Sequence, residues 1–339
     1  METPVGRVPR VLSALTSADR WGTIKARWGV GRMNYCIDPG LYALGNPSQE
    51  SPVLVTSNYK MSFDRLRAAL PGRDAWILVL DTNGINVWCS AGKGAFGTEE
   101  LVGRIKSSGL ERVVTHSRVI LPQLSAPGVA AYRVKKLSGF EAIYGPIRAE
   151  DLPAFLDAGC KATPEMRIKS FPVRERVVLI PVELVEAMKA AVFIMPALFL
   201  LGGLGGPGTF WANAANYGLF SVLAFVAALL GGVVFSPLLL PWIPGRAFAF
   251  KGMLVGLASA LVVLFFRSAE MATRAGKIEL LAWLLLIPAI ASYLAMNFTG
   301  ASTYTSLSGV KREMRYAVPL QIAAAAIGLG LWIGSRFMA

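Results

Sequence analysis

A long stretch without charged side chains constrains the fold more than any other feature of this sequence. No charged residue occurs between Lys189 and Arg246, and a helix that crosses a bilayer needs about 20 predominantly apolar residues. The gaps between charges predict five spans, at about 184–204, 217–240, 249–267, 279–299 and 316–335. We therefore expect a transmembrane domain over residues 184–339, preceded by a linker over residues 171–183.

The predicted spans are poor in ionisable residues. Lys251 and Arg267 lie at the ends of the third span, where long basic side chains can reach the polar interface. Glu270 and Glu279 fall at the edges of a loop. A transporter or a proton pump usually carries charges along its path, so we expect the spans to serve as an anchor in the lipid bilayer.

The N-terminal half has the composition of a soluble domain. Residues 1–176 contain 24 of the 34 Lys and Arg residues and 16 of the 21 Asp and Glu residues. The basic residues are scattered, and the positive-inside rule accounts for much of the net charge of +13. We therefore expect no nucleic-acid partner. The first 30 residues contain no signal-peptide core, so we predict a multi-pass protein of the cytoplasmic (inner) membrane with this domain in the cytoplasm.

Strands and helices alternate in the soluble half. Residues 1–50 are predicted to form an irregular arm with one short helix, and residues 51–170 a compact domain. The expected strands are 52–56, 75–81, 111–114, 119–121 and 141–144, and the expected helices are 61–70, 98–106, 129–136 and 150–156. This alternation indicates an α/β, Rossmann-like domain of about five mainly parallel strands with helices on both faces.

One cysteine stands in a setting suited to chemistry. Cys89 follows the predicted strand 75–81 and precedes the helix that begins at Thr98. Ligands of open α/β sheets bind at the carboxyl ends of the strands, and the N-terminus of a helix favours an anionic sulfur. Most free cysteines are small buried hydrophobes, but the small residues after Cys89 allow a ligand to approach. A soft thiolate suits a soft metal centre.

Other motifs carry weaker signals. Residues 92–97 match Gly-x-Gly-x-x-Gly, but about ten residues separate them from the strand, and the same segment fails the P-loop pattern. His116 is the only histidine, which excludes sites built on several histidines. The three cysteines lack metal-type spacing, and we interpret Cys36 and Cys160 as structural.

Residues 86–93 carry a resemblance to a known family. They read Asn-Val-Trp-Cys-Ser-Ala-Gly-Lys, which matches the signature Asn-(Val/Ile)-Trp-Cys-(Ala/Ser)-Ala-Gly-Lys of the corrinoid proteins of microbial mercury methylation. The order of a corrinoid-binding domain and five transmembrane helices is also similar to that family. The resemblance is strongest from about Trp28 to Glu183. The domain further resembles the corrinoid-binding part of the corrinoid iron–sulfur protein of the acetyl-CoA pathway.

The resemblance implies a helix that covers the lower face of a corrinoid, a cobalamin-type cobalt cofactor. Cys89 would be the catalytic residue and the lower axial ligand to cobalt. Asn86 and Trp88 would fix the helix, and Ala91 and Gly92 would permit close approach. The other corrinoid-binding residues implied are Val87, Ser90, Lys93, Thr56, Asn58, Leu121, Gln123 and Gly145.

The resemblance also implies a reaction and partners. The protein would be a methyltransferase that passes a methyl group from cobalt to Hg(II), forming methylmercury. It lacks a cysteine-rich ferredoxin motif, so a separate ferredoxin-like protein with two [4Fe–4S] clusters would supply electrons. A methyl-folate-linked methyltransferase would act upstream. Two alternatives remain: a corrinoid methyl carrier of the same family with another acceptor, and a nicotinamide-binding regulatory domain on a transporter.

Overall fold

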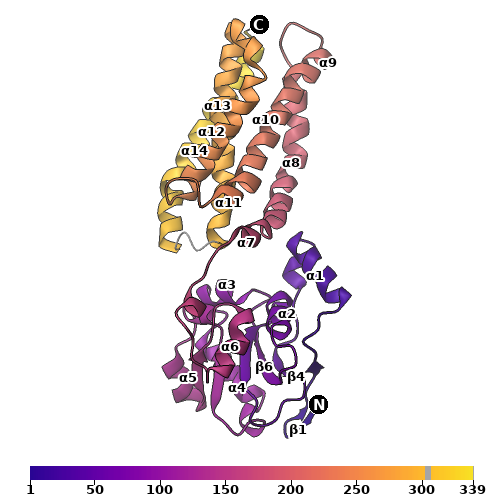
Figure 1. Cartoon of the computed structure of the whole chain (residues 1–339). Helices are drawn as coiled ribbons and strands as arrows, with labels where there is room; N and C mark the ends of the chain where they lie inside the picture. Colours follow the sequence, from indigo (N-terminus) through magenta and orange to yellow (C-terminus); the bar gives the residue numbers. More distant parts are fainter. Residues whose placement is uncertain (302–306, 339) are drawn as a thin grey trace. The chain divides into compact units, whose positions relative to one another are not determined.

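The computed structural model describes residues 1–301 and 307–338, and the chain forms two compact units (Figure 1). The first unit is Met1–Lys169 and the second is Ser170–Ala339. The first is an α/β sheet domain and the second is helical, which confirms the predicted fold class.

The first unit is built on a six-stranded sheet with the order β3-β4-β6-β5-β7-β8. Strand β4 runs antiparallel to β6, and the other neighbours are parallel. The strands are β3 (Arg10–Val11), β4 (Gly40–Leu44), β5 (Val53–Ser57), β6 (Ala75–Leu80), β7 (Arg118–Leu121) and β8 (Glu141–Tyr144). A separate hairpin joins β1 (Glu2–Thr3) to β2 (Gly6–Arg7).

Helices pack on both faces of this sheet. The helices of the first unit are α1 (Ser17–Arg27), α2 (Lys60–Ala68), α3 (Val87–Gly92), α4 (Thr98–Ser107), α5 (Ala131–Ser138) and α6 (Leu152–Asp157). Side chains alternate between the faces of a strand, so Leu78 packs with the residues of α4 and α5, whereas Ile77 packs with those of α2 and α6. Strands β5 and β6 are buried along their whole length, because both of their faces are covered.

Two predictions for the first unit were wrong. Residues 1–50 do not form an irregular arm, since they supply β3 and β4 to the sheet. The short run at 40–44 gives little local signal, and its pairing with β6 joins residues distant in sequence. Residues 111–114 do not form a strand: the chain makes a 3-10 helix at Leu110–Arg112 after Gly109, which has a φ of 58°.

The described residues of the second unit contain five helices long and apolar enough to cross a membrane, as predicted. They are Val173–Gly202, Phe210–Leu239, Phe248–Phe265, Arg274–Phe298 and Gly309–Arg336. The elements within them are α7 (Val173–Val177), α8 (Ile180–Gly202), α9 (Phe210–Asn213), α10 (Leu219–Leu230), α11 (Ser236–Leu239), α12 (Phe248–Phe265), α13 (Arg274–Ala295) and α14 (Leu307–Arg336).

Helical structure begins inside the segment expected to be a linker. The first long helix starts at Val173, because helical turns continue through the charged residues at 174–176 that the hydropathy pattern placed outside the span. Helices α8, α13 and α14 each have a proline in their interior, at Pro196, Pro288 and Pro319.

The interior of the helical unit is more charged than predicted. Glu279 is fully buried, with the Arg336 guanidinium 3.2 Å and the Arg267 guanidinium 3.8 Å from its carboxylate. Helix α13 begins at Arg274, so Glu279 lies inside the helix and not at the edge of a loop. Lys251 is also buried, and its Nζ donates to the carbonyl of Leu240 at 2.6 Å. It therefore does not extend to an interface.

Candidate functional site

The loop between β6 and α3 is held by a side chain from the neighbouring strand. Asn58 follows β5, and its Oδ1 accepts hydrogen bonds from the backbone N–H of Thr82 at 3.1 Å and of Gly84 at 3.0 Å. The hydroxyl of Thr82 lies 2.8 Å from the same oxygen, and Asn58 Nδ2 donates to Asp81 Oδ1 at 3.2 Å. Asn83 and Gly84 both have positive φ, which makes the sharp turn that directs the chain into α3.

The signature segment forms a helix, where the residues alone predicted a strand-end loop. Asn86 is its N-cap: Oδ1 accepts a hydrogen bond from the backbone N–H of Cys89 at 3.0 Å. Asparagine is among the preferred N-cap residues, since its side chain satisfies an otherwise unpaired N–H of the first turn. The hydroxyl of Ser90 donates to the carbonyl of Asn86 at 2.6 Å. Cys89 therefore lies in the first turn of its own helix.

Helix α3 crosses the point where the strand order reverses. It follows β6 but packs against the 3-10 helix at Gln123–Ser125, which follows β7. Strand β5 lies between β6 and β7 in the sheet, so α3 covers the carboxyl end of β5. This switch point is where doubly wound α/β sheets bind their ligands.

The faces of α3 differ in exposure. Ser90 and Ala91 are buried against the domain, whereas Val87, Trp88 and Cys89 are partly exposed. Gly92 and Lys93 are exposed at the end of the helix. The Cys89 thiol has no hydrogen-bond partner among the residues that the structure describes. Nor do the described residues contain a group of three or more His, Cys, Asp and Glu that could hold a metal ion. Any metal bound at α3 would have Cys89 as its single ligand from this helix.

The other predicted cofactor residues lie at the same edge of the sheet. They follow or end three strands: Thr56 and Asn58 at β5, Leu121 and Gln123 at β7, and Gly145 at β8. Thr56, Asn58 and Leu121 are buried. Gln123 accepts a hydrogen bond from Arg167, and the backbone N–H of Gly145 donates to Leu121 at 2.7 Å. The observed role of Asn58 is to hold the loop, and a contact of these five residues with a cofactor stays a prediction.

Sequence reasoning missed two features that shape this edge. A Cβ added to Gly128 would lie 2.2 Å from the carbonyl oxygen of Phe96 and 3.1 Å from Cα of Ala91. Only glycine therefore allows the segment after β7 to pack against the end of α3. Ser57, the last residue of β5, is fully buried, and its hydroxyl has no hydrogen-bond partner in the described chain. The Pro127-Gly128 pair indicates a turn in the sequence, whereas nothing in the sequence indicates that the hydroxyl of Ser57 is buried and unpaired.

The glycine motif connects two helices. Gly92 ends α3, Gly94 has a φ of 84°, and Gly97 is the N-cap of α4. In a dinucleotide-binding fingerprint the glycines follow the strand directly and open the helix. Here a helix intervenes, so the geometry agrees with the interpretation of these residues as a connector.

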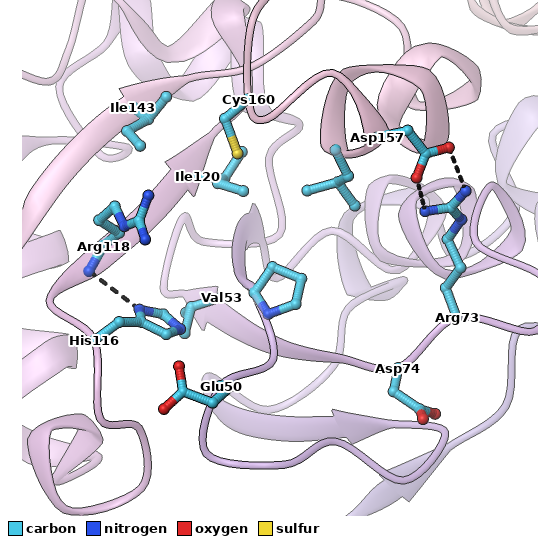
Figure 2. A pocket seen from close by; sticks show the side chains of 12 residues that line it. Glu50, Val53, Arg73, Asp74, His116, Arg118, Ile120, Ile143, Asp157 and Cys160 are labelled. Carbon is cyan, nitrogen blue, oxygen red and sulfur yellow. Dashed lines mark hydrogen bonds and ion pairs between the residues drawn. The ribbon is translucent and has the colours of Figure 1, made fainter.

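A pocket of about 440 Å³ lies at the opposite edge of the sheet, by the first residues of β5 and β7 (Figure 2). His116 and Cys160 line it, together with Arg118 and an ion pair between Arg73 and Asp157 at 2.7 Å. Burial raises the pKa of the Cys160 thiol, and Arg118 acts in the opposite direction. None of the predicted cofactor residues lines this pocket.

The third cysteine, Cys36, lies outside this pocket. It is exposed and lies near Gly84 in the β6–α3 loop.

Comparison with known proteins assigns relatives to the sheet domain. Residues 31–156 match the family model described as CO dehydrogenase/acetyl-CoA synthase delta subunit. The chain is also similar to gamma subunits of the acetyl-CoA decarbonylase/synthase complex. It is 32% identical to that of Methanopyrus kandleri over 123 residues, which are 36% of this chain and 26% of the relative. The sheet domain is related to these subunits.

The similarity is confined to part of each protein. The gamma subunit of Methanothermobacter thermautotrophicus is 31% identical over 128 residues, 37% of this chain and 28% of the relative. That of Methanocaldococcus jannaschii is 34% identical over 97 residues, 28% of this chain and 20% of the relative. The matched region thus spans about a quarter of each relative. The segment that matches the family model, residues 31–156, contains α3 and both neighbouring loops.

Proposed function

We propose that this protein is a membrane-anchored, corrinoid-dependent methyltransferase that transfers a methyl group to Hg(II) and forms methylmercury. The observation that carries the proposal is the position of Cys89, a partly exposed residue on a capped helix across the switch point of the sheet. Its thiol has no hydrogen-bond partner in the described part of the chain. The relation of the domain to subunits of acetyl-CoA-forming complexes supports a corrinoid. The match of residues 86–93 to the signature supports mercury as the acceptor.

The residues at this edge fit a large planar cofactor with a metal at its centre. Such a group needs one accessible donor and an approach free of bulky side chains. Cys89 supplies a soft sulfur donor, and a Cβ added to Gly92 would meet no atom within 4 Å. The buried hydroxyl of Ser57, the last residue of β5, has no hydrogen-bond partner in the described chain, which leaves it available to a polar group of a ligand. Buried polar groups in native proteins rarely stay unpaired.

The chain's own residues have distinct tasks in this proposal. When bound, the corrinoid supplies a cobalt centre that carries the methyl group and releases it to an acceptor. Cys89 would hold the cobalt through its sulfur, a soft donor that would pass electron density to the metal. Asn86 fixes the backbone of Cys89 through the hydrogen bond at 3.0 Å. Trp88 would help to fix the helix, and Asn58 holds the loop that positions it.

The sequence has no cysteine-rich ferredoxin motif, so we expect the electrons to come from a separate protein. A thiolate ligand would make the cobalt harder to reduce, so the cofactor would need a strong electron donor. We propose a ferredoxin-like protein with two [4Fe–4S] clusters in this role. A methyl-folate-linked methyltransferase would supply the methyl group. The protein would lie in the cytoplasmic membrane with the sheet domain in the cytoplasm, held by the five apolar helices.

Anaerobic purification of the full chain tests the cofactor and its ligand. We expect the visible absorption bands of a bound corrinoid, and a protein without these bands would contradict the proposal. Cys89→Ala should shift the bands and abolish methylmercury formation from isotopically labelled Hg(II). Cys36→Ala and Cys160→Ala are the matched controls, because both remove a free thiol outside α3. Full activity of Cys89→Ala would reject the axial-ligand role.

A second candidate is a corrinoid methyl carrier with a different acceptor. It is favoured by the relatives, which are named as subunits of an acetyl-CoA decarbonylase/synthase complex. Cells with and without the gene, given labelled Hg(II), separate the two candidates. Methylmercury that depends on the gene supports the first. Bound corrinoid without any methylmercury supports the second.

A further inference from the structure

Helix α1 is attached to the sheet domain through small and polar residues. Asp19 forms ion pairs with Lys60 at 2.5 Å and with Arg67 at 2.7 Å, both on α2. Ala26 is fully buried, and a Cβ added to Gly22 would lie 2.6 Å from the ring of Tyr35. The inner face of α1 therefore contacts the sheet domain through ion pairs and small residues.

The opposite face of α1 is apolar and exposed. Trp21, Ile24 and Trp28 are spaced at i, i+3 and i+7, which places them on one side of a helix, and their exposed fractions are 63%, 44% and 48%. Val30 and Met33, which follow the helix in the chain, are also exposed, with fractions of 62% and 70%. A helix of a soluble domain normally turns its apolar stripe inward. In α1 the stripe faces away from the domain.

The same surface is basic. Asp19 is the only acidic residue between Ser17 and Tyr35, and its charge is taken up by Lys60 and Arg67. Arg20 and Lys25 are exposed beside the apolar residues. Tryptophan together with basic residues is the composition that helices use to lie in the interface of a bilayer with anionic lipids.

The chain itself keeps the sheet domain close to a bilayer. Only Ser170–Pro172 lie between Lys169, the end of the first unit, and Val173, where the first apolar helix begins. A fully extended chain spans at most ~3.5 Å per residue. Some surface of the first unit must therefore lie near the headgroups whenever the second unit is inserted in a membrane.

We propose that α1 and the residues up to Met33 form a membrane-contact surface that binds an anionic bilayer. Trp21, Ile24 and Trp28 insert at the boundary of headgroups and acyl chains, to the depth of ~5–10 Å typical of interfacial helices. Arg20 and Lys25 contact lipid phosphates. The ion pairs of Asp19 join this surface to α2, which begins at Lys60, two residues after Asn58. The bilayer thus fixes the orientation of the sheet domain.

Site-directed spin labelling of the full chain in lipid nanodiscs tests the proposal. Cys36→Ser, Cys89→Ala and Cys160→Ser remove the native thiols, and a nitroxide is placed at Ile24→Cys. Matched controls carry it at Ser107→Cys on α4 or Lys136→Cys on α5, two exposed positions of the same unit. The readout is the collision rate with oxygen, which concentrates in the bilayer, relative to that with a water-soluble nickel chelate.

We expect the label at position 24 to favour oxygen several-fold over the controls in discs with anionic lipid. Arg20→Gln with Lys25→Gln, or raised salt, should lower this preference, because screening weakens contacts with exposed charges. Trp21→Ser with Trp28→Ser should abolish it while the inner-face contacts stay in place.

Three results would overturn the proposal. One is equal access of the chelate to positions 24 and 107 in every lipid mixture. Another is shielding of position 136 in place of position 24, which would assign the contact to α5. The third is shielding of position 24 only after addition of a purified electron-donor protein, which would make the surface a protein-docking site.

Discussion

The side-chain oxygen of Asn86 accepts a hydrogen bond from the backbone N–H of Cys89 at 3.0 Å, so the first residue of the signature fixes the position of the fourth. Helix α3, which Asn86 caps, has only six residues, Val87–Gly92. Isolated helices of this length are marginal in water, and the cap and tertiary contacts must therefore hold α3 in place.

Asn86→Ala should loosen α3. Loss of an N-cap side chain costs ~1 kcal/mol, and we expect faster hydrogen exchange of the amides at 87–92 and weaker retention of corrinoid. Asn86→Asp keeps an oxygen acceptor and is the control. If Asn86→Ala left both exchange and retention unchanged, the cap would not support the site.

Gly128→Ala should displace the end of α3, because the new Cβ would lie 2.2 Å from the carbonyl oxygen of Phe96. Overpacking of a tight contact typically costs ~1–3 kcal/mol, measured here by chemical denaturation of the full chain in detergent. Gly92→Ala is the matched control, since its Cβ would meet no atom within 4 Å. Equal stability of the two variants would argue against a tight contact at Gly128.

The attachment of α1 to α2 should weaken at low pH. Burial alone would raise the pKa of Asp19, but hydrogen bonds from Lys60, Thr16 and Arg67 outweigh it and hold the pKa well below its usual value. The group therefore contributes stability above the unfolded pKa, and this stability is lost as pH falls through the lower folded pKa. Asp19→Asn should lower the urea midpoint at pH 6, with a smaller effect at pH 3. A pH-independent difference would contradict the role of the carboxylate.

Glu279→Gln should destabilise the helical unit, because it leaves the guanidinium of Arg336 buried without its counter-charge. Removal of one partner of a buried pair costs ~3–5 kcal/mol, measured as a loss of thermal stability in detergent. Glu186→Gln breaks an exposed pair with Lys189 and should have little effect. The double variant Glu279→Gln/Arg336→Gln should regain part of the loss, and strict additivity would exclude coupling.

Elements with a local signal could be predicted from the sequence, whereas long-range contacts could not. Strands β5 to β8 alternate with helices at short intervals, and the apolar runs give the five long helices directly. Strand β4 was missed because its evidence lies in the pairing with β6, and the burial of Glu279 depends on Arg336 at the far end of the chain. Asn58 was placed at the correct edge, but the hydrogen bonds to Thr82 and Gly84 that define its observed role are visible only in the fold.

The position of α3 depends on residues outside the signature. Asn58 holds the turn before the helix, and Gly128 makes room for its end. A graft of residues 86–93 into another Rossmann-like protein would therefore transfer the cysteine without the contacts that position its helix. A transferable design has to move three separate chain segments together, and searches for functional homologues gain selectivity when they require all three.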